Sequence, residues 1–309
     1  MTALASRPVS TPPARGVWYV CAPIFVAVLA TAAVYALYRV FVLTSLGQTV
    51  DTAALRGADV SHARAVEIMS RALNGTSLVS LVLVCVAAAA IGMVRRRIGL
   101  AVAAALLVVG ANLSAQLLKM RLDRPDLDGF PAPNSFPSGH TTAAVSVAFA
   151  LVLVLPSAIR GMVALIGAAY VTVIAVATVW AEWHRPSDTV AGMLLVLAWG
   201  GLVSAVLRIA RLRVPGGLER RSRFATLLFL ISGTITGAAG LIGLAAVAMS
   251  ERVTPDLVSG RFAFLTGSAL IMAVVAGTFL IWVRLAAGDL PDSPESVPAE
   301  ADGNADVDR

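Results

Sequence analysis

The chain alternates long apolar runs with short polar segments. A helix needs about 20 residues to cross the hydrocarbon layer of a membrane, and most of the runs approach or exceed that length. Their apolar character is continuous rather than confined to one face, which is typical of a helix surrounded by lipid or protein. The sequence therefore predicts an all-α, polytopic membrane helix bundle of about eight spans, near residues 17–44, 76–94, 98–118, 141–159, 162–183, 189–210, 224–249 and 262–284.

The polar segments divide the chain into four parts. Residues 1–16 are polar and contain proline, which is typical of a disordered tail, and a six-helix membrane core is expected at 17–210. Two additional transmembrane helices are expected at 224–285. A disordered acidic tail, rich in Pro, Ala and Asp, is expected at 286–309.

Composition supports a membrane protein and argues against nucleic acid as a partner. The mean hydropathy is +0.83, with 58% hydrophobic and only 14% charged residues, which lies outside the range of soluble proteins. The net charge of +6 comes from arginines at the ends of apolar runs, where a topology signal belongs. The bilayer is therefore the expected partner, and nucleic acid is not.

The arginines also predict an orientation. With a cytoplasmic N-terminus, Arg95–Arg97 and the arginines between 208 and 223 all face the cytoplasm, as the positive-inside rule requires. Both termini are then cytoplasmic, and the outer segments are Ser45–Gly75, Lys119–Gly139 and His184–Ser187. Around Ala53–Leu73, the first of these is either an amphipathic helix at the interface or an ordinary polar loop.

The second outer segment and the start of the span that follows it contain two clusters of candidate residues. Lys119 is the only lysine among 309 residues, and it lies beside Arg121 and Arg124. Phe136-Pro137-Ser138-Gly139-His140 then immediately precedes an apolar run. Proline suits the first turn of a helix, so Pro137 is expected to open the next span and to leave the N–H groups of Ser138, Gly139 and His140 unpaired. Such a helix start is either an anion site or a plain capped terminus.

The third outer segment pairs a histidine with a carboxylate. Asp188 follows His184 by one helical turn. At this spacing the carboxylate can accept the imidazole N–H, fix the tautomer and leave the other ring nitrogen free to attack phosphorus. The alternative is an interfacial His–Asp pair without a catalytic role. Because all three clusters fall on one predicted side of the membrane, phosphoryl transfer is the chemistry that they favour.

These motifs resemble those of the type-2 phosphatidic acid phosphatase superfamily, whose core also occurs in vanadium haloperoxidases. The resemblance covers about residues 45–210, and Pro137-Ser138-Gly139-His140 matches completely. It implies a six-helix phosphatase core with His184 as the nucleophile that forms a phosphohistidine, Asp188 orienting it, and His140 as general acid and base. The implied phosphate-binding residues are Lys119, Arg124, Ser138 and Gly139. No metal and no other cofactor is implied.

The chain departs from the family pattern at two places. Four residues, rather than six, separate Lys119 from Arg124, and Thr178 stands where the third motif has a phosphate-binding arginine. Arg185 and Arg121 are the candidates to replace that arginine. Glu182 is either an interfacial carboxylate or a partner for one of these two arginines.

The resemblance predicts a hydrolase of lipid phosphates or pyrophosphates in a cell membrane, with its site on the outer face. A bacterial plasma membrane is the expected location. Candidate substrates are a polyprenyl monophosphate or diphosphate, which the resemblance favours, phosphatidic acid, phosphatidylglycerol phosphate and a polyprenyl-linked sugar phosphate. The alternatives are a phosphotransferase with the same phosphohistidine and a catalytically weak lipid-phosphate binder or transporter. The last two spans either support a homo-oligomer or shape an access path for lipid.

Overall fold

A computed structural model of the chain describes residues 18–58, 98–210, 223–253 and 258–288, with a few separate positions between 64 and 90. These residues form helices and loops and contain no strand, which confirms the predicted all-α bundle. The expected span at 76–94 lies almost entirely outside the described residues. The expected tail at 1–16 and most of the one at 286–309 also lie outside them.

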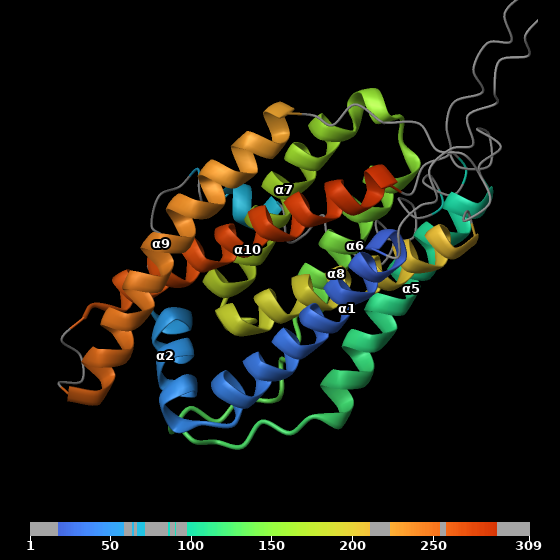
Figure 1. Cartoon of the computed structure of the whole chain (residues 1–309). Helices are drawn as coiled ribbons and strands as arrows, with labels where there is room; N and C mark the ends of the chain where they lie inside the picture. The colour runs from blue at the N-terminus through green and yellow to red at the C-terminus, as the bar shows by residue number, and fades with distance from the viewer. Residues whose placement is uncertain are drawn as a thin grey trace, which may run out of the picture.

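Six of the described helices are long and apolar enough to cross a membrane, counting α1 together with the π-helical turn η1 that extends it. α6 has 16 residues and a length of about 24 Å, which is less than a bilayer's hydrocarbon core of roughly 30 Å. The helices, shown in Figure 1, are α1 Trp18–Leu37, η1 Tyr38–Val42, α2 Ser45–Arg56, α5 Ile98–Arg121, α6 Gly139–Val154, α7 Ser157–Trp180, α8 Pro186–Ala210, α9 Arg223–Val253 and α10 Gly260–Gly288.

The long helices present apolar side chains both inward and outward. On α5, Leu107 is fully buried, whereas Leu113 and Leu117 are each more than half exposed. A soluble protein would place polar residues at such positions, but a lipid-facing surface favours leucine. In lipid each backbone N–H and C=O must also be paired inside the structure, and a continuous helix achieves this.

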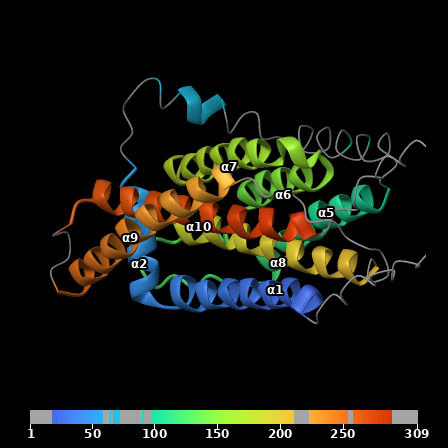
Figure 2. The same ribbon diagram turned by 45° about the horizontal axis from the view of Figure 1, so that its top comes forward.

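α8 is central to the bundle and packs against α1, α5, α6 and α10 (Figure 2). α1 approaches it closely at Gly201, where a Cβ atom would lie 2.6 Å from the carbonyl oxygen of Pro23. Any other residue would therefore push the two helices apart. Small residues at such crossings are how membrane helices come into close van der Waals contact.

α10 packs into the main core, although its sequence lies beyond the six-helix segment at 17–210. Trp282 is fully buried and stacks on Phe149 of α6, with ring centroids 4.8 Å apart, and its indole N–H donates to the Phe149 carbonyl at 3.0 Å. Phe279 meets Phe149 edge to face. α9 packs chiefly along α10. α10 is therefore part of the hydrophobic core, and α9 packs on its outer side.

α2 differs from the expected interfacial helix. It begins at Ser45, eight residues before the expected Ala53, and ends at Arg56. Gln48, Asp51 and Thr52 are all buried, because this face of α2 bonds to the loop between α5 and α6 and to the start of α8. The apolar face of α2 packs against α9 and α10. The amphipathic pattern therefore reflects a polar face that is turned into the protein. Most of the expected range beyond residue 58 lies outside the described part of the chain.

The functional segments gather at one end of the bundle. Lys119 lies in the last turn of α5, α6 begins at Gly139, and α8 begins at Pro186, directly after the α7–α8 turn. The irregular segment 122–138 joins α5 to α6 along the same end as α2 (Figure 1).

We expect Trp282→Ala to destabilise the protein by roughly 3–5 kcal/mol, because it leaves a cavity in the core and an unpaired Phe149 carbonyl. The measurement is thermal unfolding in detergent. Trp18→Ala is the matched control, since Trp18 is 76% exposed at the start of α1. Equal shifts of the two unfolding midpoints would contradict the assignment of α10 to the core.

Candidate active site

The start of α6 leaves two backbone N–H groups available. Ser138 is the N-cap, and its hydroxyl accepts a hydrogen bond from the Thr141 N–H at 3.3 Å. The Ser138 N–H donates to the Asp188 carbonyl at 2.8 Å, so this amide is not unpaired as expected. Pro137 precedes the cap instead of opening the helix. Among the described residues, the N–H groups of Gly139 and His140 have no acceptor, and they can bind an anion.

His184 is held by the turn between α7 and α8. Its backbone N–H donates to the Thr178 carbonyl at 3.2 Å, and its side chain is buried. The imidazole Nδ1 lies 3.7 Å from Asp188 Oδ2, which is too long for a hydrogen bond. Nδ1 has no hydrogen-bond partner among the described residues. The structure thus places His184 and Asp188 side by side, as predicted, but without the predicted hydrogen bond between them.

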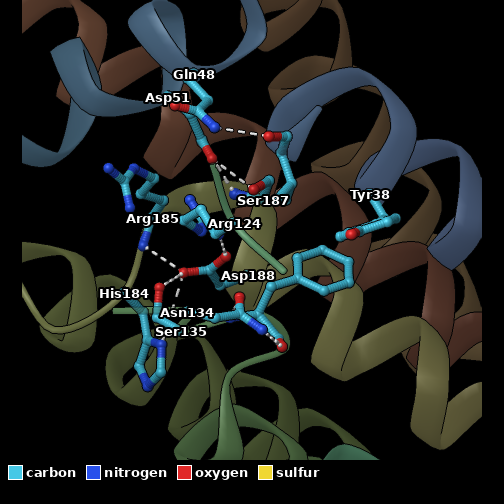
Figure 3. A network of polar contacts seen from close by, with 12 residues as sticks. Tyr38, Gln48, Asp51, Arg124, Asn134, Ser135, His184, Arg185, Ser187 and Asp188 are labelled. Atoms are coloured by element: carbon cyan, nitrogen blue, oxygen red, sulfur yellow. Dashed lines mark hydrogen bonds and ion pairs between the residues drawn. The ribbon is translucent and has the colours of Figure 1, made fainter. Parts of the chain in front are cut away.

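The Asp188 carboxylate is the centre of the polar network (Figure 3). It is fully buried and accepts hydrogen bonds from Arg124 NH2 at 2.5 Å, from the Ser135 hydroxyl at 2.6 Å and from the Arg185 N–H at 3.0 Å. The Arg124 guanidinium compensates its charge, and the other two donors fix its orientation. Asp188 therefore joins the 122–138 segment to the start of α8.

Arg124 is the buried cation of the site. Its side chain is 2% exposed, and only NH2 is paired, with Asp188. Nε and NH1 are buried and have no hydrogen-bond partner among the described residues. Buried donors without an acceptor are costly, and a bound anion would supply acceptors.

His140 and Lys119 lie beside this network. The His140 ring centroid is 6.1 Å from that of His184 and 5.3 Å from that of Trp183. Lys119 is partly buried and near enough for its positive charge to act on the His140 imidazole. Asn134 donates to the Lys119 carbonyl at 3.2 Å and so ties the end of α5 to the loop before α6.

The structure does not bring Arg121 into this site, and it turns the Arg185 side chain away. Arg121 is exposed and has no hydrogen bond or ion pair with a described residue. The Arg185 guanidinium points away from Asp188 (Figure 3), donates to the Thr52 hydroxyl at 3.0 Å and lies 3.8 Å from Asp128. Glu182 is exposed and forms no ion pair with either arginine. Of the arginines considered, Arg124 alone pairs its guanidinium with Asp188, whereas Arg185 donates only its backbone N–H.

Thr178 does not provide a substitute for the expected arginine. Its side chain is fully buried and its hydroxyl donates to the Ala175 carbonyl. Its backbone carbonyl accepts hydrogen bonds from Trp183 and His184. The position therefore supports the turn that carries His184 and has no side-chain donor directed at the site.

Asp51 is a buried residue of the network whose role the sequence did not predict. Its carboxylate accepts hydrogen bonds from both the N–H and the hydroxyl of Ser187, in the first turn of α8. Burial, and secondarily the negative charge of Asp188, raises the pKa of Asp51 to about 7. Asp51 thus holds the first turn of α8, which carries Asp188, through its two hydrogen bonds to Ser187.

Gln48 fixes the loop that carries Arg124. Its amide nitrogen donates to the carbonyls of Val42 and Pro125, and its amide oxygen accepts from the Leu127 N–H. Gln48, Asp51 and Thr52 are spaced three and four residues apart, so they share one face of α2. This polar stripe, in a segment that the sequence predicts to lie outside the membrane, was the available signal for these contacts.

The described part of the chain contains no group of three or more His, Cys, Asp or Glu side chains placed to hold a metal ion. The predicted independence from metal stays a prediction, and so do the predicted catalytic roles.

Comparison with known families matches residues 98–211 to the PAP2 superfamily, the family that the motifs resemble. The matched segment runs from the start of α5 to the end of α8 and contains every predicted site residue. Comparison with curated proteins and with solved structures gave no match.

We expect Asp51→Asn to change how stability depends on pH. The pKa of Asp51 is raised from 3.8 to about 7, so the folded protein keeps a proton there that the unfolded chain releases above about pH 4. This contribution to stability is largest at low pH and is lost as the pH rises to about 7, by at most about 4 kcal/mol. Thermal unfolding in detergent between about pH 4 and pH 8 measures it.

The wild-type unfolding midpoint should fall relative to that of Asp51→Asn as the pH rises through this window. Asp123→Asn, which changes an exposed carboxylate in the neighbouring loop, is the control. Parallel curves for the wild type and Asp51→Asn would contradict the raised pKa.

Proposed function

We propose that the chain is a membrane phosphatase that hydrolyses a lipid phosphate or pyrophosphate through a phosphohistidine, since residues 98–211 match the PAP2 superfamily. The observation that carries this proposal is the convergence of His184, His140 and the Arg124–Asp188 pair at one end of an apolar helix bundle. A histidine nucleophile and an acid–base histidine are the groups that such a two-step transfer needs.

In the first step, His184 attacks phosphorus through Nε2, because Nδ1 faces Asp188. The bond from phosphorus to the leaving oxygen breaks, and His140 donates the proton that this oxygen takes up. In the second step, His140 accepts a proton from water, whose oxygen attacks phosphorus and releases inorganic phosphate and free His184. The 3.7 Å contact between His184 and Asp188 closes to a hydrogen bond when substrate is bound, as catalytic contacts commonly do.

The phosphate oxygens are bound by donors that the protein leaves unpaired. Arg124 offers Nε and NH1, the start of α6 offers the N–H groups of Gly139 and His140, and Lys119 adds a positive charge. These groups neutralise the charge that develops on the oxygens in the transition state, so the reaction needs no metal. Ser138 supports this cradle as the helix cap.

The location of the site supports a lipid substrate. A site at the end of a membrane bundle can receive a phosphate whose hydrocarbon chain stays in the bilayer. We assign the site to the outer face of the membrane, with both termini cytoplasmic, because the arginine distribution favours this orientation. A polyprenyl monophosphate or diphosphate is the favoured substrate, and phosphatidic acid and related lipid phosphates are the others to test.

One observation favours a second candidate, a lipid-phosphate binder with weak activity. Thr178 replaces the phosphate-binding arginine of the family pattern, and its side chain is bonded within α7. Loss of one preorganised charge commonly lowers a rate by about 10²–10³. The rate of phosphate release separates the two candidates, because a phosphatase releases phosphate over many turnovers and a binder releases little.

We expect His184→Ala to abolish phosphate release from a panel of lipid phosphates, because the variant lacks the nucleophile. The assay measures free phosphate from purified protein in detergent, and its stoichiometric yield excludes transfer to another acceptor. Vanadate should inhibit the wild type, and EDTA should have little effect. Thr172→Ala, in α7 but outside the site, is the control. Phosphate release by His184→Ala at the wild-type rate would remove His184 from the mechanism.

We expect Arg124→Lys to lower kcat/KM for lipid phosphates by about 10²–10³, because lysine keeps the charge but lacks the planar set of donors. The matched control is Arg39→Lys, since Arg39 is exposed and its guanidinium donates to the Tyr35 hydroxyl, away from the site. The kinetic measurement uses the same phosphate assay. A similar kcat/KM for both variants would exclude Arg124 from phosphate binding.

A further inference from the structure

The first turn of α8 is capped by a residue of another helix. Pro186, the first residue of α8, has no N–H, and Arg185 before it has a side chain without a hydrogen-bond acceptor. The preceding side chain therefore cannot cap the Ser187 N–H, as an N-cap residue commonly does. Asp51 of α2 caps it instead: Oδ1 accepts the Ser187 N–H at 3.1 Å, and Oδ2 accepts the Ser187 hydroxyl at 2.5 Å.

The space behind this turn offers little to replace Asp51. An apolar cavity of about 210 Å³ lies there, and Pro186 and Ser187 are part of its lining. Besides Asp51 and Ser187, the lining contains one polar side chain, that of Thr266. Water in a protein cavity needs about two to four polar partners, and this cavity does not provide them. Without Asp51, the first turn of α8 would face apolar space and would have room to shift.

The same turn carries or contacts both parts of the candidate active site. The Asp188 side chain faces His184, with Oδ2 at 3.7 Å from Nδ1. The Asp188 carbonyl accepts the Ser138 N–H at 2.8 Å, and Ser138 caps α6, which begins with the amides of Gly139 and His140. A shift of this turn would therefore move the partner of the proposed nucleophile and disturb the amides that we propose to bind phosphate.

α2 is a firm support for this cap. Its apolar face packs against α9 and α10, and its polar face bonds to the loop between α5 and α6, through Gln48 to Pro125 and through Thr52 to Asp128. The Asp51 side chain between them is buried. A site held on rigid elements keeps its geometry more precisely than one on loops. α2 lies outside the segment that matches the PAP2 superfamily, so the family match assigns it no role.

We infer that Asp51 is a positioning residue for the reaction at His184: through Ser187 it fixes the first turn of α8, and with it Asp188 and the start of α6. Asp51 lies on the opposite side of this turn from His184 (Figure 3), so it acts through the turn. The inference rests on the proposed function and deepens it, because it makes α2 necessary for catalysis. A misplacement of about 1 Å can lower a rate by about 10², so the effect should appear in kcat.

The substitutions at Asp51 separate hydrogen bonding from charge. Asp51→Leu has a similar side-chain volume and removes both hydrogen bonds. Asp51→Asn keeps them without the charge, because its oxygen can accept the Ser187 N–H and its NH2 group can donate to the Ser187 hydroxyl. Burial raises the pKa of Asp51 to about 7, so asparagine resembles the protonated form that predominates below that pH. The matched control is Thr49→Val, since the Thr49 hydroxyl donates to the Ser45 carbonyl within α2.

The first test measures steady-state phosphate release from a lipid phosphate. Asp51→Leu should lower kcat by about 10–10²-fold and leave KM close to the wild-type value, because the change affects the transition state. Asp51→Asn and Thr49→Val should keep the wild-type kcat. A residue with a merely structural role would change the folded fraction, which thermal unfolding measures, but not the kcat of the folded protein. An equal loss with Asp51→Asn and Asp51→Leu, or no loss with either, would overturn the inference.

The second test needs no turnover. Vanadate mimics the five-coordinate transition state, and its binding to the full-length protein in detergent is measured by calorimetry. Its Kd should rise at least about tenfold in Asp51→Leu and stay unchanged in Asp51→Asn. Because Asp51 acts through Ser187, adding Ser187→Ala to Asp51→Leu should weaken binding no further, and an additive loss would contradict this route. If Asp51→Leu does not fold, Ser187→Ala decides, since it removes one of the two bonds and should weaken vanadate binding on its own.

The two tests also separate this inference from the proposed function. A wild type that binds vanadate without releasing phosphate would refute hydrolysis, and weaker vanadate binding by Asp51→Leu would then retain the positioning role. Phosphate release by the wild type, with unchanged kcat and vanadate affinity in Asp51→Leu, would retain hydrolysis and refute the positioning role. A wild type that neither binds vanadate nor releases phosphate would refute both.

Discussion

The structure of the site depends on how one buried carboxylate is compensated. Asp188 lies in the first turn of α8 and is fully buried, a situation that is costly for a charge unless it is paired and hydrogen-bonded. Arg124 supplies the opposite charge, and Ser135 and the Arg185 N–H supply two further donors. Because these donors come from the loop before α6 and from the α7–α8 turn, satisfying Asp188 brings both segments into one place.

The same requirement explains why the segments at this end of the bundle are joined by so many hydrogen bonds. The loop that carries Arg124 is irregular, so its backbone groups need partners that a helix would have supplied. Gln48 binds this loop at Pro125 and Leu127, and Asn134, near the end of the loop, donates to the Lys119 and Leu122 carbonyls at its beginning. These bonds hold Arg124 in place beside the buried Asp188 carboxylate, although the loop that carries it has no regular secondary structure. Rigid support of this kind is what an active-site charge needs in order to act without reorganisation.

The sequence predicted features that depend on neighbouring residues, such as helices and the spacing of side chains along them. It was less informative about contacts between segments that are far apart in the chain. Runs of apolar residues predicted seven of the described helices, because lipid requires continuous helix. The one-turn spacing of His184 and Asp188 correctly placed them side by side. The burial of α2 could not be predicted, since it depends on α9 and α10, about 170 residues or more further along the chain. The pairing of Ser138 N–H with the Asp188 carbonyl is equally non-local, and it changed the expected set of free amides.

The position of α10 has a consequence for the order of assembly. This helix follows the histidine-bearing segments in the chain, yet it packs against α2, α7 and α8 and places Trp282 against Phe149. The surroundings of Asp51 and the start of α8 are therefore incomplete while the helices that carry the histidines are already inserted. The finished polar centre therefore depends on a helix that is synthesised after both histidines.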